Sequence, residues 1–196
     1  KKYKGVKSVI VVKRCNNPVT MQAKRDTWWH EETAKVSAKH AAKAFDSEHP
    51  LFVLYTSGST GKPKGIVHTQ GGFPLKIAHD ALVHFDLAPG DVFCWPADMG
   101  WIAGSLVLAA ALLRGATLVC YSGGPDYPDF SRLSRLIERH GITHFGSAPT
   151  LIRGMASHAA EASQGDVSSV KLLITAGEGI DPEHFCWFQL HFGRGT

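Results

Sequence analysis

Apolar residues in this chain come in short continuous runs, and most of these runs are separated by longer stretches with apolar residues at helical spacing. Short runs rich in Val, Ile and Leu predict strands buried in a parallel sheet, whereas a period near 3.6 residues predicts helices. The expected strands cover residues 6–13, 51–56, 92–95, 116–121, 142–146 and 170–175. The expected helices cover residues 33–45, 68–85, 102–113, 129–140, 149–160 and 182–191.

The alternation of strands with helices from residue 51 onward predicts an α/β fold, with a doubly wound, mainly parallel sheet and helices on both faces. We expect residues 1–50 to form a lead-in strand and helix, and residues 51–196 to form the alternating core. Candidate chemistry follows three expected strands, at residues 56–65, 97–104 and 176–180. Ligands of such sheets bind at the carboxyl ends of strands, so these stretches predict the site.

Local signals predict several helix ends. Asp98 and Asp181 each precede an expected helix and can accept backbone N–H bonds as caps. Pro182 suits the first turn of the last helix. Gly115 follows Arg114 and is expected to end the apolar helix that starts at residue 102.

The densest chemistry lies at residues 55–65, which read Tyr-Thr-Ser-Gly-Ser-Thr-Gly-Lys-Pro-Lys-Gly. Glycines let the backbone approach a ligand closely, and hydroxyls and amide N–H groups donate to phosphate oxygens. We therefore interpret this stretch as a phosphate-binding loop rather than a flexible linker, because linkers rarely follow a buried strand. Its spacing matches neither the Walker A motif nor the dinucleotide-binding motif G-x-G-x-x-G. The segment after it, 66–84, is predicted to be largely helical.

Composition narrows the partners of this chain. The 196 residues carry a formal net charge of only +4, and the basic residues form no nucleic-acid stripe, so we expect no nucleic-acid partner. The longest apolar stretch, 102–113, is too short to span a bilayer. The four cysteines lie far apart, which argues against a zinc site and a disulfide scaffold and favours a reduced, cytoplasmic setting.

Histidine and serine chemistry is not indicated either. The chain has eleven histidines, but we find no H-x-x-x-H spacing with a third ligand, so we expect no metal held by the protein alone. The nucleophile motif G-x-S-x-G is absent as well.

The ten residues 56–65 resemble the phosphate loop of the adenylate-forming superfamily, which includes acyl-CoA synthetases, peptide-synthetase adenylation domains and luciferases. The resemblance implies that the loop holds the β- and γ-phosphates of ATP while a carboxylate attacks the α-phosphate. It implies phosphate contacts from Thr56, Ser57, Gly58, Ser59, Thr60, Gly61 and Lys64. Thr56 and Lys64 are the expected catalytic residues.

The stretch 97–104, Ala-Asp-Met-Gly-Trp-Ile-Ala-Gly, resembles a segment of acetyl- and propionyl-CoA synthetases. The resemblance implies that Trp101, Ile102 and Ala103 border the acyl pocket and the CoA tunnel, with Ala103 standing where the family usually has threonine. Judged from the residues alone, Trp101 is either a core side chain or the wall of a pocket.

The turn at 175–180, Thr-Ala-Gly-Glu-Gly-Ile, resembles the adenine-binding turn of the same enzymes. The resemblance implies that Gly177, Glu178 and Gly179 lie against adenine, although Gly179 replaces the usual proline. Ala176 stands where acetate-selective enzymes carry valine. From the residues alone, the turn could equally be a plain connection with Glu178 exposed.

Three further segments resemble these synthetases. In the loop 123–128, Asp126 stands where the family often has an asparagine that contacts CoA, and an aspartate there is unfavourable beside CoA phosphates. The turn at 147–150 resembles one beside the CoA channel. The segment 28–30, Trp-Trp-His, resembles one that precedes the phosphate loop, and its expected physical role is a hydrophobic anchor.

Together these resemblances imply an acetyl/propionyl-type acyl-CoA synthetase, which converts a short-chain carboxylate and ATP to an acyl-adenylate and then, with coenzyme A, to acyl-CoA. Mg²⁺ is expected to arrive with ATP. The alternatives are an adenylation domain that serves a carrier protein and a non-catalytic nucleotide-binding module. The segments 28–30 and 100–101 argue against the first alternative. Both ends appear cut, so we expect an internal fragment that lacks the family's C-terminal domain and is inactive alone. Alanine at positions 103 and 176 predicts an acid longer than acetate.

Overall fold

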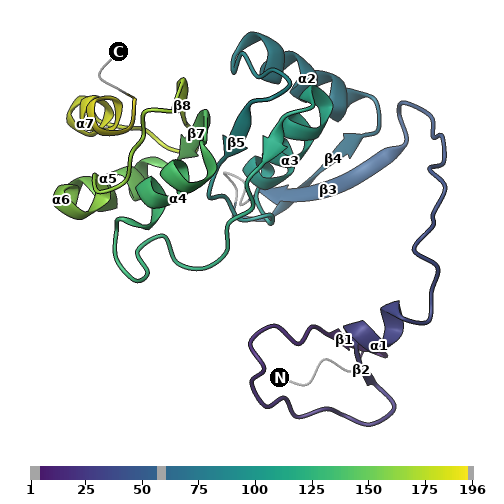
Figure 1. Ribbon diagram of the computed structural model, residues 1–196. Helices are drawn as coiled ribbons and strands as arrows, with labels where there is room; N and C mark the ends of the chain where they lie inside the picture. Colours follow the sequence, from purple (N-terminus) through teal and green to yellow (C-terminus); the bar gives the residue numbers. More distant parts are fainter. Residues whose placement is uncertain (1–4, 57–60, 194–196) are drawn as a thin grey trace. The chain divides into compact units, whose positions relative to one another are not determined.

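The computed structural model describes residues 5–56 and 61–193. The chain divides into two compact units, Lys1–Ala44 and Phe45–Thr196, and each is considered by itself (Figure 1).

The first unit contains two short strands and one turn of helix. Strand β1 (Val9–Val11) pairs in parallel with β2 (Asp26–Trp28), and α1 (Trp29–Thr33) follows at once. The predicted strand 6–13 forms over only three residues, and Ile10 is 54% exposed, so the expectation of a buried strand was wrong.

The predicted helix 33–45 does not form. Helix α1 ends at Thr33, and no helix follows it between residues 34 and 45. Its side chains are almost all exposed. An isolated helix of this length is marginal in water without an apolar face packed against a partner. Alanine-rich composition was therefore insufficient evidence for a helix here.

The second unit starts with a hairpin: the predicted strand 51–56 is present as β3 (Pro50–Thr56), but a second strand follows the loop before the predicted helix begins. Strand β3 pairs with β4 (Lys64–Thr69) in an antiparallel two-stranded sheet. The prediction that residues 66–69 belong to a helix was wrong. Ile66, Val67 and Thr69 are β-branched, which restricts their side chains and favours extended backbone.

Helix α2 (Gly72–Val83) begins directly after the hairpin, where the Thr69 hydroxyl accepts a hydrogen bond from the Gly72 N–H at 3.1 Å. The Phe52 ring stacks on His68 with centroids 4.6 Å apart and meets Phe73 edge-on at 4.9 Å. These rings pack β3 and β4 against α2.

The main sheet has four parallel strands in the order β6-β5-β7-β8. The strands are β5 (Val92–Cys94), β6 (Thr117–Leu118), β7 (His144–Ser147) and β8 (Leu172–Thr175). The helices that follow α2 are α3 (Ile102–Arg114), α4 (Arg132–His140), α5 (Pro149–Ser157), α6 (Ala159–Ala162) and α7 (Pro182–Phe192).

Both faces of this sheet are covered by helices. Successive residues of a strand point to opposite faces, and β5 follows this rule. Phe93 packs in a core with α2 and α3, whereas Cys94 packs in a second core with α4, α5 and α7. The predicted doubly wound α/β sheet is therefore confirmed (Figure 1).

Two of the three predicted helix ends are confirmed. Gly115 ends α3 in the left-handed conformation, with φ of 67°, and the Asp181 carboxylate accepts the His184 N–H at the start of α7. The predicted cap at Asp98 was wrong. Its carboxylate instead accepts the Gly100 N–H at 2.7 Å, and α3 starts without a side-chain cap.

All four cysteines are free thiols, and no pair of them forms a disulfide. Within the described part of the chain, we find no helix with the length and apolar character needed to cross a membrane.

Candidate functional site

The topology leaves a crevice at the carboxyl ends of β5 and β7, which are neighbours in the sheet. The helix after β5 is α3, which packs through Val107 on the same face of the sheet as α2. The helix after β7 is α5, which packs through Ile152 on the opposite face. Connections that leave adjacent parallel strands toward opposite faces separate from each other, and ligands of such sheets bind there.

A pocket of about 620 Å³ occupies this end of the sheet. Its lining comes from the segments that follow β5, β7 and β8 and consists of Trp95, Pro96, Ala97, Asp98, Trp101, Ile102, Ala103, Ala148, Ala176, Gly177 and Glu178. Two stretches that the sequence analysis selected, 97–104 and 176–180, thus contribute to one pocket. Six individually predicted residues line it: Trp101, Ile102, Ala103, Ala176, Gly177 and Glu178.

Trp95 forms a wall of the pocket, and sequence reasoning missed it. Its indole packs so closely on β7 that a methyl group added at Gly146 would stand 2.5 Å from Cγ of Trp95. Gly146 therefore leaves the space that the indole fills. A large aromatic residue at the carboxyl end of β5 was the available signal, because that edge of a parallel sheet is where ligands bind.

The segment 97–104 folds back tightly onto the first turn of α3. A Cβ atom at Gly104 would lie 2.6 Å from the Cα of Met99, so only glycine fits without moving backbone. The Trp101 N–H donates to the Asp98 carbonyl at 3.0 Å. Trp101 is 70% exposed and lines the pocket, so it is a pocket residue rather than a core residue.

Glu178 points its carboxylate at the start of α5. It accepts the Thr150 N–H at 2.8 Å and the Thr150 hydroxyl, and it pairs with the Arg153 guanidinium at 3.1 Å. These hydrogen bonds, first those from Thr150 and then that from Arg153, lower the pKa of Glu178. A negative charge beside free N–H groups at a helix start is stabilising.

Glu178 is thus exposed but not a free side chain, and neither Thr150 nor Arg153 was predicted as its partner. Because the carboxylate is engaged by α5, the surface left to a ligand is the backbone of the turn 177–179. Gly177 has φ of +104°, a conformation that favours glycine.

The hairpin tip carries the predicted phosphate-binding residues. Thr56 on β3 stands opposite Lys64 on β4 in the register, so the two expected catalytic residues are neighbours across the hairpin. Gly61 has φ of +76° in the connection. Ser57, Gly58, Ser59 and Thr60 lie outside the described residues. Neither Thr56 nor Lys64 lines the pocket beside Trp95.

Asp126 also does not line that pocket. It lies in the exposed loop after β6, which Arg132 holds by donating to the Tyr127 carbonyl at 2.7 Å and to the Ser122 carbonyl at 2.9 Å. The Arg132 guanidinium lies over the Tyr121 ring, 4.9 Å from its centroid. The structure therefore does not bring Asp126 together with the other predicted acyl and CoA residues.

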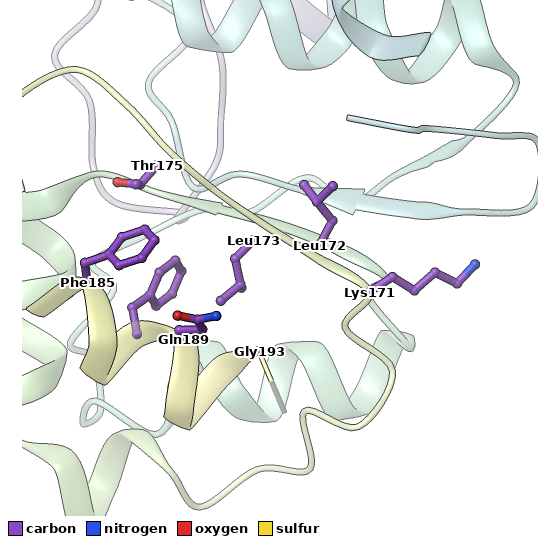
Figure 2. Close-up of a pocket in the computed structure, with 8 residues that line it drawn as sticks. Lys171, Leu172, Leu173, Thr175, Phe185, Gln189 and Gly193 are labelled. Carbon is purple, nitrogen blue, oxygen red and sulfur yellow. The ribbon is translucent and has the colours of Figure 1, made fainter. Parts of the chain in front are cut away.

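A second, smaller pocket of about 240 Å³ lies between β8 and α7 and contains none of the predicted site residues (Figure 2). Leu172, Leu173 and Thr175 line it from the strand, and Phe185 and Gln189 line it from the helix. Its residues lie along the edge strand, whereas the larger pocket lies where several connections meet, so the larger one is the better candidate.

The opposite ends of the same strands carry a buried polar network. Asp91 accepts hydrogen bonds from Lys171 Nζ at 2.7 Å and from the Ala88 N–H at 2.9 Å. Thr143 Oγ1 donates to Asp91 and accepts the Val92 N–H. Burial works against the Asp91 charge, but the hydrogen bonds from Lys171 and from the Ala88 N–H outweigh it and lower the pKa of Asp91.

His144 lies beside this network. Its Nδ1 is 2.8 Å from Thr143 Oγ1. Its side chain is buried, and burial lowers its pKa, which favours the neutral ring at pH 7. The amino end of the sheet is thus closed by satisfied polar groups.

Comparison with known proteins places this geometry in context. All residues, 1–196, match the family described as AMP-binding enzyme. The chain is 44% identical over 192 residues to an acetyl-coenzyme A synthetase of Streptomyces avermitilis, covering 96% of this chain and 29% of that protein. It is 42% identical over 194 residues to the acetyl-coenzyme A synthetase of Mycobacterium bovis, covering 97% of this chain and 30% of that protein.

A solved structure agrees with these sequence matches. The acetoacetyl-CoA synthetase from Streptomyces lividans superposes with a TM-score of 0.78 at 32% identity, and the match covers 96% of this chain and 28% of that one. The chain therefore spans about 30% of the length of the curated relatives it matches.

Proposed function

This chain belongs to the AMP-binding enzyme family, and we propose that it is part of an AMP-forming acyl-CoA ligase that acts on a short-chain carboxylate. The single observation that carries this proposal is the pocket at the crevice. It unites the segment after β5, which resembles the acyl and CoA segment of acetyl-CoA synthetases, with the turn after β8, which resembles their adenine turn.

The reaction has two steps. A carboxylate oxygen attacks the α-phosphorus of ATP, and pyrophosphate leaves, which gives an acyl-adenylate. The sulfur of coenzyme A then attacks the acyl carbon, its thiol proton is lost, and AMP leaves. At phosphorus the protein has to position the reactants and neutralise charge, so hydroxyl, amide and ammonium groups suffice.

The hairpin tip is our proposed phosphate grip. Thr56 and Lys64 face each other across the two strands, so a hydroxyl and an ammonium group flank the connection that carries the remaining hydroxyls. These groups fit a polyphosphate chemically, and Mg²⁺ would enter with ATP. A hairpin holds both ends of such a loop by backbone hydrogen bonds, which limits how far the phosphate ligands can separate.

The turn after β8 is our proposed adenine contact. Glu178 is drawn toward α5 by Thr150 and Arg153, which leaves Gly177 and Gly179 to present backbone to a flat ring. A Cβ atom at either glycine would meet nothing within 4 Å, so the space above the turn is open.

The acyl group would lie beside Ala103 and Ala176, which line the same pocket. Both side chains are methyl groups, which leaves more room than the threonine and valine expected in acetate-selective enzymes. A buried methylene contributes about 0.8 kcal/mol, so we propose an acid longer than acetate as the preferred substrate.

Lys64→Ala in the full-length parent tests the proposed function. We expect acid-dependent exchange of pyrophosphate into ATP to slow by about tenfold or more, because one charge-assisted contact to phosphate is lost. Lys62→Ala is the matched control, since Lys62 is paired with no residue of β3 and should change the rate less. Equal rates for Lys64→Ala and the parent enzyme would remove Lys64 from the mechanism.

Ala176→Val in the same enzyme tests the acyl pocket. We expect kcat/KM for propionate or butyrate to fall by about tenfold relative to acetate, since one methylene in an apolar pocket is worth about 1–3 kcal/mol. If acetate is the best substrate of the unmodified enzyme and valine changes nothing, the pocket assignment is wrong.

We also propose that the 196-residue chain alone does not form acyl-CoA, because it spans only about 30% of the length of its relatives. The purified chain with acid, ATP and coenzyme A should give no product by liquid chromatography. Measurable acyl-CoA would contradict this. In the full-length parent, coenzyme A rather than a carrier protein should accept the acyl group.

A further inference from the structure

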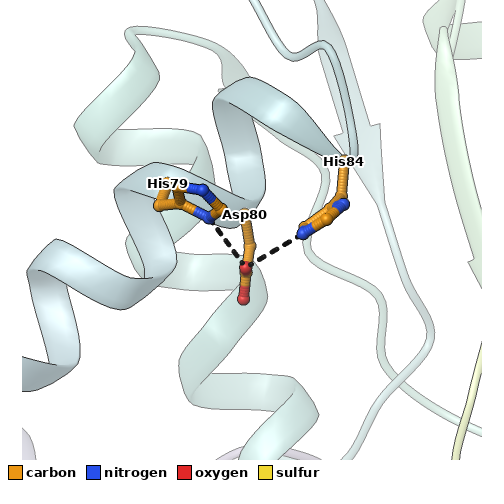
Figure 3. A group of neighbouring side chains, drawn as sticks. All are labelled: His79, Asp80 and His84. Atoms are coloured by element: carbon orange, nitrogen blue, oxygen red, sulfur yellow. Dashed lines mark hydrogen bonds and ion pairs between the residues drawn. The ribbon is translucent and has the colours of Figure 1, made fainter.

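The C-terminal end of α2 brings together two imidazoles and a carboxylate, those of His79, Asp80 and His84 (Figure 3). His79 Nδ1 lies 3.5 Å from Asp80 Oδ1, and His84 Nε2 lies 3.7 Å from the same oxygen. One ligand atom from each residue lies within 4.8 Å of the other two. Among residues 5–56 and 61–193, no other group of three such side chains meets this criterion.

We propose that this cluster binds a late first-row transition-metal dication such as Zn²⁺, with three protein ligands and water completing the coordination. Two ligands held about 2.0–2.1 Å from a tetrahedral zinc ion stand about 3.4 Å apart. The separations of 3.5 and 3.7 Å from Asp80 Oδ1 are within a few tenths of an ångström of that value, and the two imidazole nitrogens lie within 4.8 Å of each other. Small rotations of the rings would therefore complete the site.

The surroundings allow these rotations. The His79 and His84 side chains are 57% and 60% exposed, so the rings can turn and water can reach the open position. The Asp80 side chain is only 14% exposed and is thereby held in place between them. His84 is the C-cap residue directly after the twelve-residue helix α2, and the C-terminal end of a helix attracts cations.

In this structure the Asp80 carboxylate forms an ion pair with a lysine. Lys76 Nζ lies 2.5 Å from Asp80 Oδ2, one helical turn before it. The Lys76 side chain is 66% exposed, so a metal ion can replace it at the carboxylate while the ammonium group moves into water. The lysine and the metal ion are expected to compete for Asp80.

The ligand set indicates which metals fit. Imidazole nitrogen suits zinc, copper and nickel, whereas magnesium is bound through oxygen ligands and water. The site is therefore distinct from any Mg²⁺ that enters with ATP, and it contains no residue of the proposed phosphate, adenine or acyl contacts. The spacing search missed it because the two histidines are five residues apart and meet only where α2 ends.

Calorimetric titration of the 196-residue chain with Zn²⁺ tests the proposal. We expect one high-affinity equivalent with a Kd in the micromolar range or below, and Co²⁺ should give a visible absorption band with similar stoichiometry. Mg²⁺ at millimolar concentration should not displace the zinc. His79→Gln and His84→Gln should each raise the Kd by about tenfold or more, because one of three protein ligands is lost.

Two further variants make the test specific. Lys76→Met should lower the Kd by about threefold or more, since it removes the competing cation. His184→Gln is the matched control, because His184 has a single carboxylate partner, Asp181 at 2.7 Å, and belongs to no group of three; it should leave the Kd unchanged. Only variants whose circular dichroism spectrum matches that of the unmodified chain are compared. If a histidine variant fails to fold, Asp80→Asn is used in its place.

Several results would overturn the site. They are a Kd for the unmodified chain above about 100 µM, equal losses for His184→Gln and His84→Gln, or wild-type affinity in both His79→Gln and His84→Gln. Wild-type affinity in Asp80→Asn would exclude Asp80 as a ligand and would equally overturn the three-ligand site.

Discussion

At the amino ends of β5, β7 and β8 the polar groups bond to one another, whereas at the carboxyl ends of the same strands the side chains border an open pocket. Asp91 and His144 are 5% and 2% exposed at the amino end. Trp101 is 70% exposed at the carboxyl end. One sheet therefore has a closed edge and an open edge.

The difference follows from the connections. At the amino edge Asp91, Thr143 and Lys171 each stand directly before a strand, and hydrogen bonds to Asp91 join them across three strands. At the carboxyl edge the connections leave toward opposite faces, which separates them and leaves space. We conclude that the amino edge stabilises the sheet and that the carboxyl edge is available for ligands.

Displacing Trp95 from the wall of the open edge should have the largest effect on stability. Gly146→Ala places a methyl group 2.5 Å from Cγ of Trp95, so the indole must leave its position. We expect a loss of about 3 kcal/mol in the free energy of unfolding, the upper part of the usual range for overpacking. Denaturant unfolding of the 196-residue chain, followed by tryptophan fluorescence, measures it.

Gly154→Ala is the control for this substitution. A methyl group at Gly154 would meet the Phe130 ring at an ordinary 3.4 Å, and the residue lies inside α5, where alanine is favoured. We expect unchanged or slightly higher stability, by up to about 1 kcal/mol. Similar losses for both variants would show that Trp95 is not held by Gly146.

Weakening the closed edge should have an intermediate effect. Asp91→Asn removes the charge that Lys171 and the Ala88 N–H stabilise, and we expect a loss of about 1–2 kcal/mol in the free energy of unfolding at pH 7. Because folding lowers the pKa of Asp91 below its ordinary 3.8, its charge stabilises the fold above that pH. The stabilisation is lost as the pH falls through the lower, folded-state pKa.

Unfolding free energies measured between pH 3 and pH 7 test this dependence. The difference between the unmodified chain and Asp91→Asn should be constant above about pH 5 and should shrink below about pH 4. Lys171→Gln should cost less than Asp91→Asn, since the Lys171 side chain is 65% exposed and water replaces it. A difference that grows toward acid pH would contradict the assigned role of Asp91.

The smallest effect is expected at the Glu178 contact, which lies at the open edge but is exposed to solvent. Glu178→Gln removes the negative charge that accepts hydrogen bonds from the Thr150 N–H and from Arg153, so the turn at 177–179 is held less firmly. In the full-length parent we expect the KM for ATP to rise about threefold with little change in kcat, as for loss of a binding contact.

Arg153→Ala separates the two partners of Glu178. It leaves the bonds from Thr150 intact, so the KM for ATP should rise less than in Glu178→Gln. If Arg153→Ala has the larger effect, the arginine contacts the nucleotide itself and the carboxylate only holds the arginine.

Local sequence signals determined a large part of this fold. The strands β5, β7 and β8 and the helices α3, α4 and α7 each follow from their own apolar runs and periods, and Gly115 and Asp181 mark helix ends through bonds to nearby backbone. The stretches that line the pocket were identifiable because each directly follows a strand of a parallel sheet. These features depend on residues close together in the chain.

Pairing between distant segments decided the rest. Strand pairing placed residues 66–69, which were expected to start a helix, in β4, and the absence of a packing face left 33–45 without a helix. The contacts of Trp95 with Gly146, of Glu178 with Thr150 and of Asp91 with Lys171 join residues separated by 51, 28 and 80 positions. No local period encodes such partners, because they depend on which strands lie side by side after the chain has folded.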